Sequence, residues 1–277
     1  MRFVAGEDLE DAFQAARSLN RQGIATMLDH LGENVSSEEQ ASAASDAYVR
    51  ALKRAHETDD LDCNIAVKLT QLGLDLSYDL CMENSERVLA AASERNTLVM
   101  IDMESHEYVD RTLLAHRELK ERYPHVGLAL QAYLYRTAAD VYGLPQGSTV
   151  RLCKGAYLEP PSVAIPSKRE VDRNFARLFS TLATLGHTIH VASHDPPLVD
   201  GARRFAERRG VSWDRVEFQF LYGIRRDLQQ RYARDGYPVR VYVPYGSEWY
   251  PYLTRRMAER PANIWFFASN LIRGGWQ

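Results

Sequence analysis

Eight short runs of apolar and β-branched residues recur along this chain, and polar residues follow each of them. The runs span residues 24–28, 65–69, 97–102, 126–131, 149–153, 188–192, 216–220 and 239–243. They are too short and too uniformly apolar for strands with one face in water, whereas buried parallel strands have this pattern. Amphipathic segments lie between the runs, and strands that alternate with helices are typical of an α/β fold.

Helices are predicted in the intervals between the runs. Ser36 and Glu39 form a candidate capping box before an amphipathic segment that ends at residue 56. Leu9, Phe13 and Ala16 indicate a further helix before the first run. The remaining helical segments are expected at about 84–94, 107–122, 170–185, 196–210 and 228–235.

No Pro/Gly/Ser-rich linker, low-complexity tract or charge run divides the sequence. The 277 residues are close to the length that an eight-fold β/α barrel needs. We therefore predict one catalytic domain over residues 1–277, folded as a single (β/α)8 TIM-type barrel with an N-terminal helix and a final helix over the C-terminal mouth. An open sheet of nine elements is the alternative fold.

Composition excludes several classes of protein. The net charge is −3 and the pI is about 6.3, which gives no electrostatic case for binding nucleic acid. No apolar stretch approaches the roughly 18 residues that span a bilayer, and the first residues lack the pattern of a signal peptide. Three well-separated cysteines without metal spacing indicate reduced thiols in a cytoplasmic protein.

Barrel enzymes carry their active sites at the carboxyl ends of the strands. Polar residues should therefore follow each run, and they do. They are Asp29–His30, Lys68–Thr70, Asp102–Glu104, Gln131, Lys154–Gly155, Ser193–Asp195, Gln219 with Tyr222, and Tyr242 with Tyr245.

The segment after the last run offers a candidate carboxylate clamp. Tyr252, Arg255, Arg256 and Glu259 are spaced i, i+3, i+4 and i+7, so they share one helix face. Paired guanidiniums bind a carboxylate through charge-assisted bonds. The alternative is a solvated face with i,i+4 ion pairs.

Three more cations stand at strand ends or within strands. Lys68 is expected to bind a substrate carboxylate, to act as a Schiff-base nucleophile, or to lie at the rim. Arg151 lies inside an apolar run and needs an anion, for which Glu259 or a bound cofactor is a candidate. Lys154 and Gly155 suit a phosphate or the polar edge of a flavin. Neither GxGxxG nor a P-loop occurs.

A metal-dependent hydrolase is a weaker hypothesis. It would use His30, Asp102, His194 and Asp195, but the sequence contains no His-x-His pair after the first run and no HExxH. We expect no metal.

Eight segments follow one another in the order IAVKL, IDMES, LALQAYLYRT, RLCKGAY, VASHD, EFQFLYG, YVPYG and YLTRRMAE. Together they resemble the proline dehydrogenase family, both its monofunctional bacterial members and the dehydrogenase domain of bifunctional proline-utilisation flavoproteins. The resemblance implies a distorted (β/α)8 barrel that binds FAD non-covalently, oxidises L-proline to Δ1-pyrroline-5-carboxylate and passes electrons to a membrane quinone. It also implies pyrroline-5-carboxylate dehydrogenase as a downstream partner and a cytoplasmic location, with peripheral attachment to the inner face of the cell membrane left open.

The resemblance also assigns roles to individual residues. Asp102 and Arg151 are implied as the catalytic pair beside the flavin, with Arg151 tied to Glu259. The implied substrate-binding residues are Lys68, Tyr242, Tyr252, Arg255, Arg256 and Leu221. The implied FAD contacts are Met103, Gln131, Arg151, Cys153, Lys154, Gly155, Ser193, His194, Gln219 and Glu259. One departure is Leu158, where many relatives have an aromatic residue.

Three other functions remain open on the same fold. An aldolase or lyase would use Lys68 as its Schiff-base nucleophile. A different barrel flavoenzyme, of the methylenetetrahydrofolate reductase kind, would require NAD(P)H. A non-catalytic barrel would bind an amino acid without oxidising it.

Overall fold

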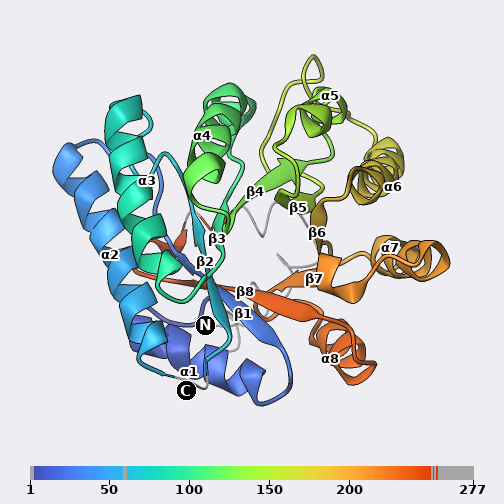
Figure 1. Cartoon of the computed structure of the whole chain (residues 1–277), viewed down its shortest axis with the longest axis horizontal. Coiled ribbons are helices and arrows are strands. Elements are labelled where there is room, and N and C mark those ends of the chain that lie inside the picture. Colours follow the sequence, from blue (N-terminus) through green and yellow to red (C-terminus); the bar gives the residue numbers. More distant parts are fainter. Residues whose placement is uncertain (1–2, 59–60, 251, 253, 255–277) are drawn as a thin grey trace, which may run out of the picture.

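The computed structural model describes residues 3–58, 61–250, 252 and 254, and its eight strands form a closed, all-parallel barrel (Figure 1). The first strand pairs with the last, with Leu28 opposite Val243, and this pairing closes the sheet. The predicted barrel is therefore confirmed, and the open-sheet alternative is wrong. The strands are β1 Ala25–His30, β2 Cys63–Val67, β3 Val99–Ile101, β4 Val126–Gln131, β5 Thr149–Cys153, β6 Thr188–Ala192, β7 Val216–Leu221 and β8 Val239–Tyr245.

Strand β2 lies two residues earlier than the predicted run. It ends at Val67, and the chain then turns, because the backbone N–H of Leu72 donates to the carbonyls of Lys68 and Leu69. Lys68 is therefore the first residue beyond the strand, at the carboxyl end of the barrel. The bounds of β4, β5 and β6 agree with the predicted runs.

Helices surround the barrel (Figure 1). The predicted capping box was wrong by one residue, since Ser37 caps the second helix by accepting from the N–H of Gln40, while the N–H of Ser36 donates to the Gln40 side chain. The third helix starts earlier than expected because Ser77 caps it through the N–H of Leu80. The α-helices are α1 Leu9–Asn20, α2 Glu38–His56, α3 Tyr78–Ser93, α4 Val109–Arg122, α5 Thr137–Asp140, α6 Lys168–Leu185, α7 Pro196–Arg209 and α8 Arg226–Arg234, and the 3₁₀ helices are η1 His106–Tyr108, η2 Val141–Gly143 and η3 Trp213–Arg215.

The strand residues divide between two cores. Because side chains alternate across a strand, one set points outward to the helices and the other into the barrel. Outward residues such as Leu28, Ile65 and Phe218 belong to the main apolar core. Met27 and Met100 belong to a separate small cluster in the interior. The rest of the interior is largely polar, which sets up the site described below.

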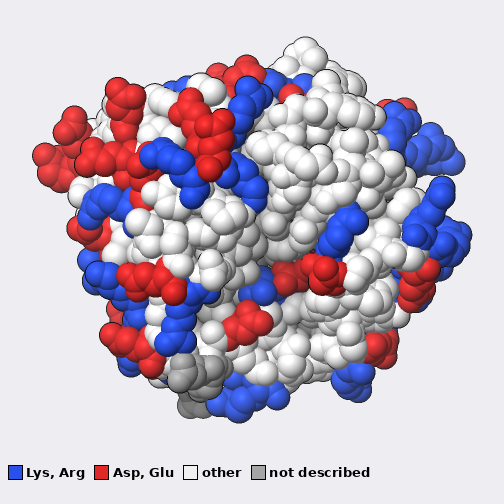
Figure 2. All heavy atoms as spheres, viewed as in Figure 1, with Lys and Arg blue, Asp and Glu red and all other residues white. Residues whose placement is uncertain are grey.

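Charge is unevenly distributed over the face drawn in Figure 2. Acidic and basic side chains are dense on the side of α2 and α3, whereas the area toward α5 is largely uncharged.

Among the described residues, no helix combines the length and the apolar character required to cross a membrane.

Candidate active site

A cavity of about 470 Å³ opens at the carboxyl ends of the strands. The structure brings most of the predicted site residues to its wall, although they come from six different strand ends. Gln131 does not line it, and Arg255, Arg256 and Glu259 lie outside the described residues. The predicted residues that do line it are Lys68, Asp102, Met103, Arg151, Cys153, Lys154, Gly155, Ser193, His194, Gln219, Leu221, Tyr242 and Tyr252.

Asp102 joins three of these residues at the base of the cavity. One carboxylate oxygen accepts from Arg151 Nη1, and the other accepts from the Tyr242 hydroxyl at 2.7 Å and lies 4.0 Å from Lys68 Nζ. The Arg151 guanidinium also lies 5.0 Å from the centre of the Tyr242 ring, within range of a cation–π interaction. Burial and the Asp102 carboxylate raise the pKa of Tyr242 well above its usual value, so Tyr242 remains a hydrogen-bond donor.

Lys68 has a second carboxylate partner that we did not predict. Lys68 Nζ lies 2.9 Å from Asp29 Oδ1, and both side chains are buried. Burial by itself would lower the pKa of Lys68, but Asp29 and Asp102 outweigh it and hold the pKa above its usual value. Lys68 is therefore an ammonium at neutral pH. The available sequence signal for Asp29 was its place at the end of β1, one strand away from Lys68.

Arg151 has two further partners besides Asp102. Its Nε donates to Gln219 Oε1 at 2.8 Å, and its Nη2 contacts the sulfur of Met27. Together with the bond to Asp102, these contacts hold the buried Arg151 guanidinium in a single orientation. The anion that the structure shows beside Arg151 is thus Asp102, while the predicted tie to Glu259 falls outside the described residues.

Another part of the wall is built from the residues that follow β5 and β6. Lys154 Nζ lies 2.5 Å from Asp172 and 2.9 Å from Asp195. His194 Nε2 accepts from the backbone N–H of Leu221 at 2.9 Å, so this nitrogen carries no proton.

Gly155 can only be a glycine. Its φ is +118°, and a Cβ there would approach the ring of Tyr133 to 2.3 Å. The backbone of Gly155 therefore forms a bare part of the cavity wall.

Gln131 lies beneath the loop that follows β3. Its Nε2 donates to the carbonyls of Met103 at 2.8 Å and Glu104 at 2.9 Å, so it holds the backbone that carries the Met103 side chain into the wall. Its Oε1 is buried and has no hydrogen-bond partner among the described residues.

The loop after β5 differs locally from the family pattern. Leu158, which replaces the aromatic residue of many relatives, is fully exposed. The next residue, Glu159, fixes the loop instead, because it accepts from the backbone N–H of His106 at 2.8 Å and lies 2.5 Å from His106 Nδ1.

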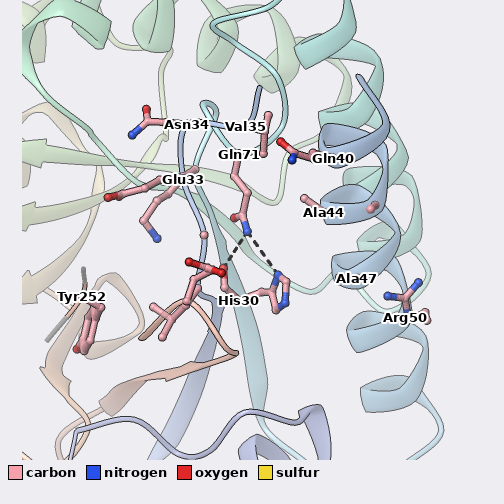
Figure 3. A pocket seen from close by; sticks show the side chains of 15 residues that line it. His30, Glu33, Asn34, Val35, Gln40, Ala44, Ala47, Arg50, Gln71 and Tyr252 are labelled. Carbon is pink, nitrogen blue, oxygen red and sulfur yellow. Dashed lines mark hydrogen bonds between the residues drawn. The ribbon is translucent and has the colours of Figure 1, made fainter. Parts of the chain in front are cut away.

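A second cavity of about 480 Å³ lies beside the first, between α2 and the loop after β1. Figure 3 shows Ala44, Ala47 and Arg50 of α2 along one side and Tyr252 across from them. Lys68 and Tyr252 line both cavities, so the two share a wall. His30, considered above as a metal ligand, lies here and receives hydrogen bonds from the Gln71 side chain on its Nδ1 and its carbonyl.

The metal-site hypothesis gains no support from this arrangement. Within the ranges that the structure describes, no three His, Cys, Asp or Glu side chains come close enough to hold an ion together.

Comparison with known proteins agrees with the site. The family model described as proline dehydrogenase matches residues 12–268. The proline dehydrogenase of Deinococcus radiodurans is 41% identical over 279 residues, which cover 99% of this chain and 90% of that protein. Proline dehydrogenase 2 of Bacillus subtilis strain 168 is 38% identical over 266 residues, which cover 96% of this chain and 88% of that protein.

Solved structures show the same fold at lower identity. Proline utilization A from Bdellovibrio bacteriovorus superposes with a TM-score of 0.84 at 24% identity, over 92% of this chain. Proline utilization A from Bradyrhizobium japonicum gives a TM-score of 0.74 at 22% identity. This chain spans 32% and 30% of those two proteins, so they establish the barrel alone. Taken with the family model and the bacterial relatives, the sequence and its site show that the chain belongs to the proline dehydrogenase family.

Proposed function

We propose that this enzyme binds FAD, oxidises L-proline to Δ1-pyrroline-5-carboxylate at the cavity above Asp102, and passes the electrons to a membrane quinone. The observation that carries the proposal is the buried cluster of Asp102, Arg151, Tyr242 and Lys68 under an open cavity. It combines a fixed guanidinium and a charged ammonium at the position where barrel enzymes act. The proposed setting is the cytoplasm, peripheral to the inner face of the membrane, with pyrroline-5-carboxylate dehydrogenase as the downstream partner.

The cavity has the donor set that a flavin needs. Arg151 is a buried guanidinium at the wall, and Lys154 with the bare backbone of Gly155 offers a positive charge at the rim. Gln131 does not line the cavity, but its Oε1 is a buried acceptor without a partner among the described residues, and such an atom is costly unless a donor reaches it. We propose that these residues, together with Met103, Cys153, Ser193, His194, Gln219 and Glu259, hold FAD. When bound, the flavin supplies the hydride acceptor, and the protein supplies position and field.

Lys68 is the proposed anchor for the substrate carboxylate. Asp29 and Asp102 keep it protonated, and it lies in the wall of the cavity. Arg255 and Arg256 are proposed to complete the carboxylate clamp. Holding a substrate by its carboxylate fixes the ring carbon that reacts, and orientation of this kind lowers a barrier by several kcal/mol. Cations around the carboxylate also lower the pKa of the substrate amine, which favours its neutral form.

Tyr242, Tyr252 and Leu221 are proposed to close over the proline ring. All three line the cavity. Tyr242 also donates to Asp102, so its ring has a fixed place in the wall, and a hydroxyl added to the substrate ring would meet it there. We propose that Tyr242 discriminates against hydroxylated proline.

The Schiff-base alternative is disfavoured by Lys68 itself. A nucleophilic lysine needs a depressed pKa, whereas the two carboxylates hold the pKa of Lys68 above its usual value.

The test starts from the purified protein under anaerobic conditions. It should be yellow, and proline should bleach it; a quinone analogue should then restore the colour, while NAD(P)+ should not. Lys68→Met should raise KM for proline about 10- to 100-fold while FAD remains bound, because a charge-assisted hydrogen bond is lost. Lys53→Met, which removes an exposed lysine from α2, is the matched control. A colourless protein, or one that borohydride traps with a carbonyl substrate, would overturn the proposal.

A further inference from the structure

A row of polar side chains continues from Arg151 through the barrel. The interior of such barrels is usually filled by branched apolar side chains in layers. Here Gln219 and Glu217 of β7, His190 of β6 and Arg240 of β8 occupy interior positions and form a chain of hydrogen bonds that starts at Arg151, and we call these four residues the interior ladder. Glu217 is the least buried of them, with 14% of its side chain exposed.

The Gln219 amide is the member of the interior ladder that contacts Arg151. Its Oε1 accepts from Arg151 Nε at 2.8 Å, and its Nε2 donates to Glu217 Oε1 and to His190 Nδ1, both at 2.8 Å. An amide has its acceptor at one end and its donors at the other. Because a carboxylate only accepts, Glu217 requires the NH2 end of Gln219. The carbonyl end must then face Arg151.

Arg240, at the other end of the interior ladder, holds the Glu217 carboxylate in place. Arg240 Nε lies 3.0 Å from both oxygens of its carboxylate, and Arg240 Nη1 donates to the Thr26 carbonyl at 2.7 Å and to Asp62 Oδ1 at 2.9 Å. Burial alone would raise the pKa of Glu217, but the electrostatic interactions with His190 and Arg240 and the hydrogen bonds from Gln219 and Arg240 together outweigh burial and hold the pKa below its usual value. Glu217 is therefore a carboxylate at neutral pH.

His190 supports the same orientation of the amide. Burial lowers its pKa to about 4, so the ring is neutral at pH 7. A neutral imidazole has one acceptor nitrogen, and Nδ1 takes that role when the proton is on Nε2. Two acceptors thus face the NH2 end of Gln219, and its carbonyl oxygen is left to accept from Arg151.

We infer that Glu217 is a positioning residue, which acts through Gln219 to hold the Arg151 guanidinium in the orientation needed beside the reacting groups. This inference rests on the proposed function, since that is where Arg151 is placed beside a flavin. Buried ion pairs contribute little net stability after desolvation, and their better-supported role is to select one arrangement. Two buried guanidiniums and a largely buried carboxylate inside a barrel fit that role.

The first variant is Glu217→Gln. An amide at position 217 either donates or accepts, so it no longer dictates which end of Gln219 faces Arg151. We expect kcat to fall at least about tenfold, because a misplaced group near the chemistry costs up to about a hundredfold. KM for proline should change less than threefold, since Lys68 still binds the carboxylate. The reduction potential of the bound flavin should become more negative, because a nearby cation is no longer held in place.

The second variant exchanges the two residues, as Glu217→Gln combined with Gln219→Glu. The carboxylate at position 219 then accepts from Arg151 directly, and the amide at position 217 donates to that carboxylate and accepts from Arg240. The charge of the interior ladder is unchanged, so this variant tests the idea even where the single variant fails to fold. We expect it to recover most of the kcat that the single variant loses.

Asp62→Asn serves as the control at the Arg240 end of the interior ladder. The Asp62 side chain is 64% exposed, and Arg240 keeps its bonds to Glu217 and Thr26 without it, so kcat should stay within twofold of the parent value.

A purely structural role predicts a different pattern. Glu217→Gln would then lower Tm while kcat and the flavin potential stay at parent values, and that result would overturn the inference. So would an exchange variant that folds and binds flavin but is no faster than the single variant. Failure of the proposed function looks different again, because the parent protein itself would then lack flavin or fail to be reduced by proline.

Discussion

Replacing Glu104 with glutamine should stabilise the folded protein at neutral pH, because the native carboxyl is buried at an energetic cost. Glu104 is 3% exposed, and its oxygens accept from the N–H of Thr70 at 3.1 Å and from the Thr70 hydroxyl at 2.5 Å. Burial raises the pKa of Glu104 from 4.5 to about 6, although the two bonds from Thr70 lower it. Glutamine keeps both bonds, with its carbonyl facing the N–H and its NH2 facing the hydroxyl.

The magnitude follows from the pKa difference of 6 − 4.5 = 1.5 for Glu104. At 1.36 kcal/mol for each unit, the ionised carboxyl costs the folded state about 2 kcal/mol. The folded protein binds this proton more tightly than the unfolded chain does, so stability is fully present below pH 4.5 and is lost as pH rises through 6. Glu104→Gln removes that loss. The variant should therefore gain up to about 2 kcal/mol over the native protein above pH 6.

The assay is urea unfolding of the native protein and the variant from pH 4.5 to pH 7.5. Burial lowers the pKa of His116 and of His190 to about 4, so both proteins also lose stability as pH falls below 6.5. That contribution is common to the two proteins and cancels in their difference. Glu107→Gln, which removes an exposed carboxylate from η1, three residues further along the chain, measures the effect of net charge alone. A difference that is flat with pH, or that grows toward acid pH, would refute the reasoning.

Two further predictions concern the base of the cavity. Burial lowers the pKa of Lys68 and Asp29 raises it, so Asp29→Asn should lower the pKa of Lys68. KM for proline should then begin to rise at a lower alkaline pH than in the native enzyme. An unchanged pH profile of KM would contradict the pairing of Lys68 with Asp29. Tyr242→Phe removes the 2.7 Å bond to Asp102, and we expect the ratio of kcat/KM for proline and hydroxyproline to change several-fold while Tm, followed by circular dichroism, falls by about 2–8 °C.

The fold was predictable because each strand is buried on both faces. A run such as 126–131 or 188–192 has no solvent-facing side, and parallel strands covered by helices are the usual structure with that property. The ends of the strands were less predictable. Leu69 is apolar and extends the predicted run past Val67 and Lys68, and the turn that ends β2 depends on backbone bonds from Leu72 that leave no signal in the apolar pattern.

The site was predictable as a place and less so as a set of pairs. Polar residues after each strand had to meet at one end of the barrel, and the structure collects them there. The partner of each residue depends on the register between strands. Lys68 pairs with Asp29, 39 residues earlier, and Arg151 with Gln219, 68 residues later. A single sequence contains nothing that selects Asp29 over the other carboxylates near the mouth.

The inward position of the charged residues of the interior ladder could also have been predicted from the sequence. Outward-facing strand residues must pack against helices, so a charged residue inside a buried strand has to point into the barrel. Arg151, Glu217 and Arg240 all satisfy that condition, and parallel pairing of β5 through β8 brings them to neighbouring levels. The two faces of the sheet therefore have different roles, the outer face in stability and the inner face in placing Arg151. Stability depends mainly on the outer apolar layer, to which Leu28 and Phe218 belong, so truncations there should unfold the protein, whereas conservative changes in the interior should leave it folded with Arg151 misplaced.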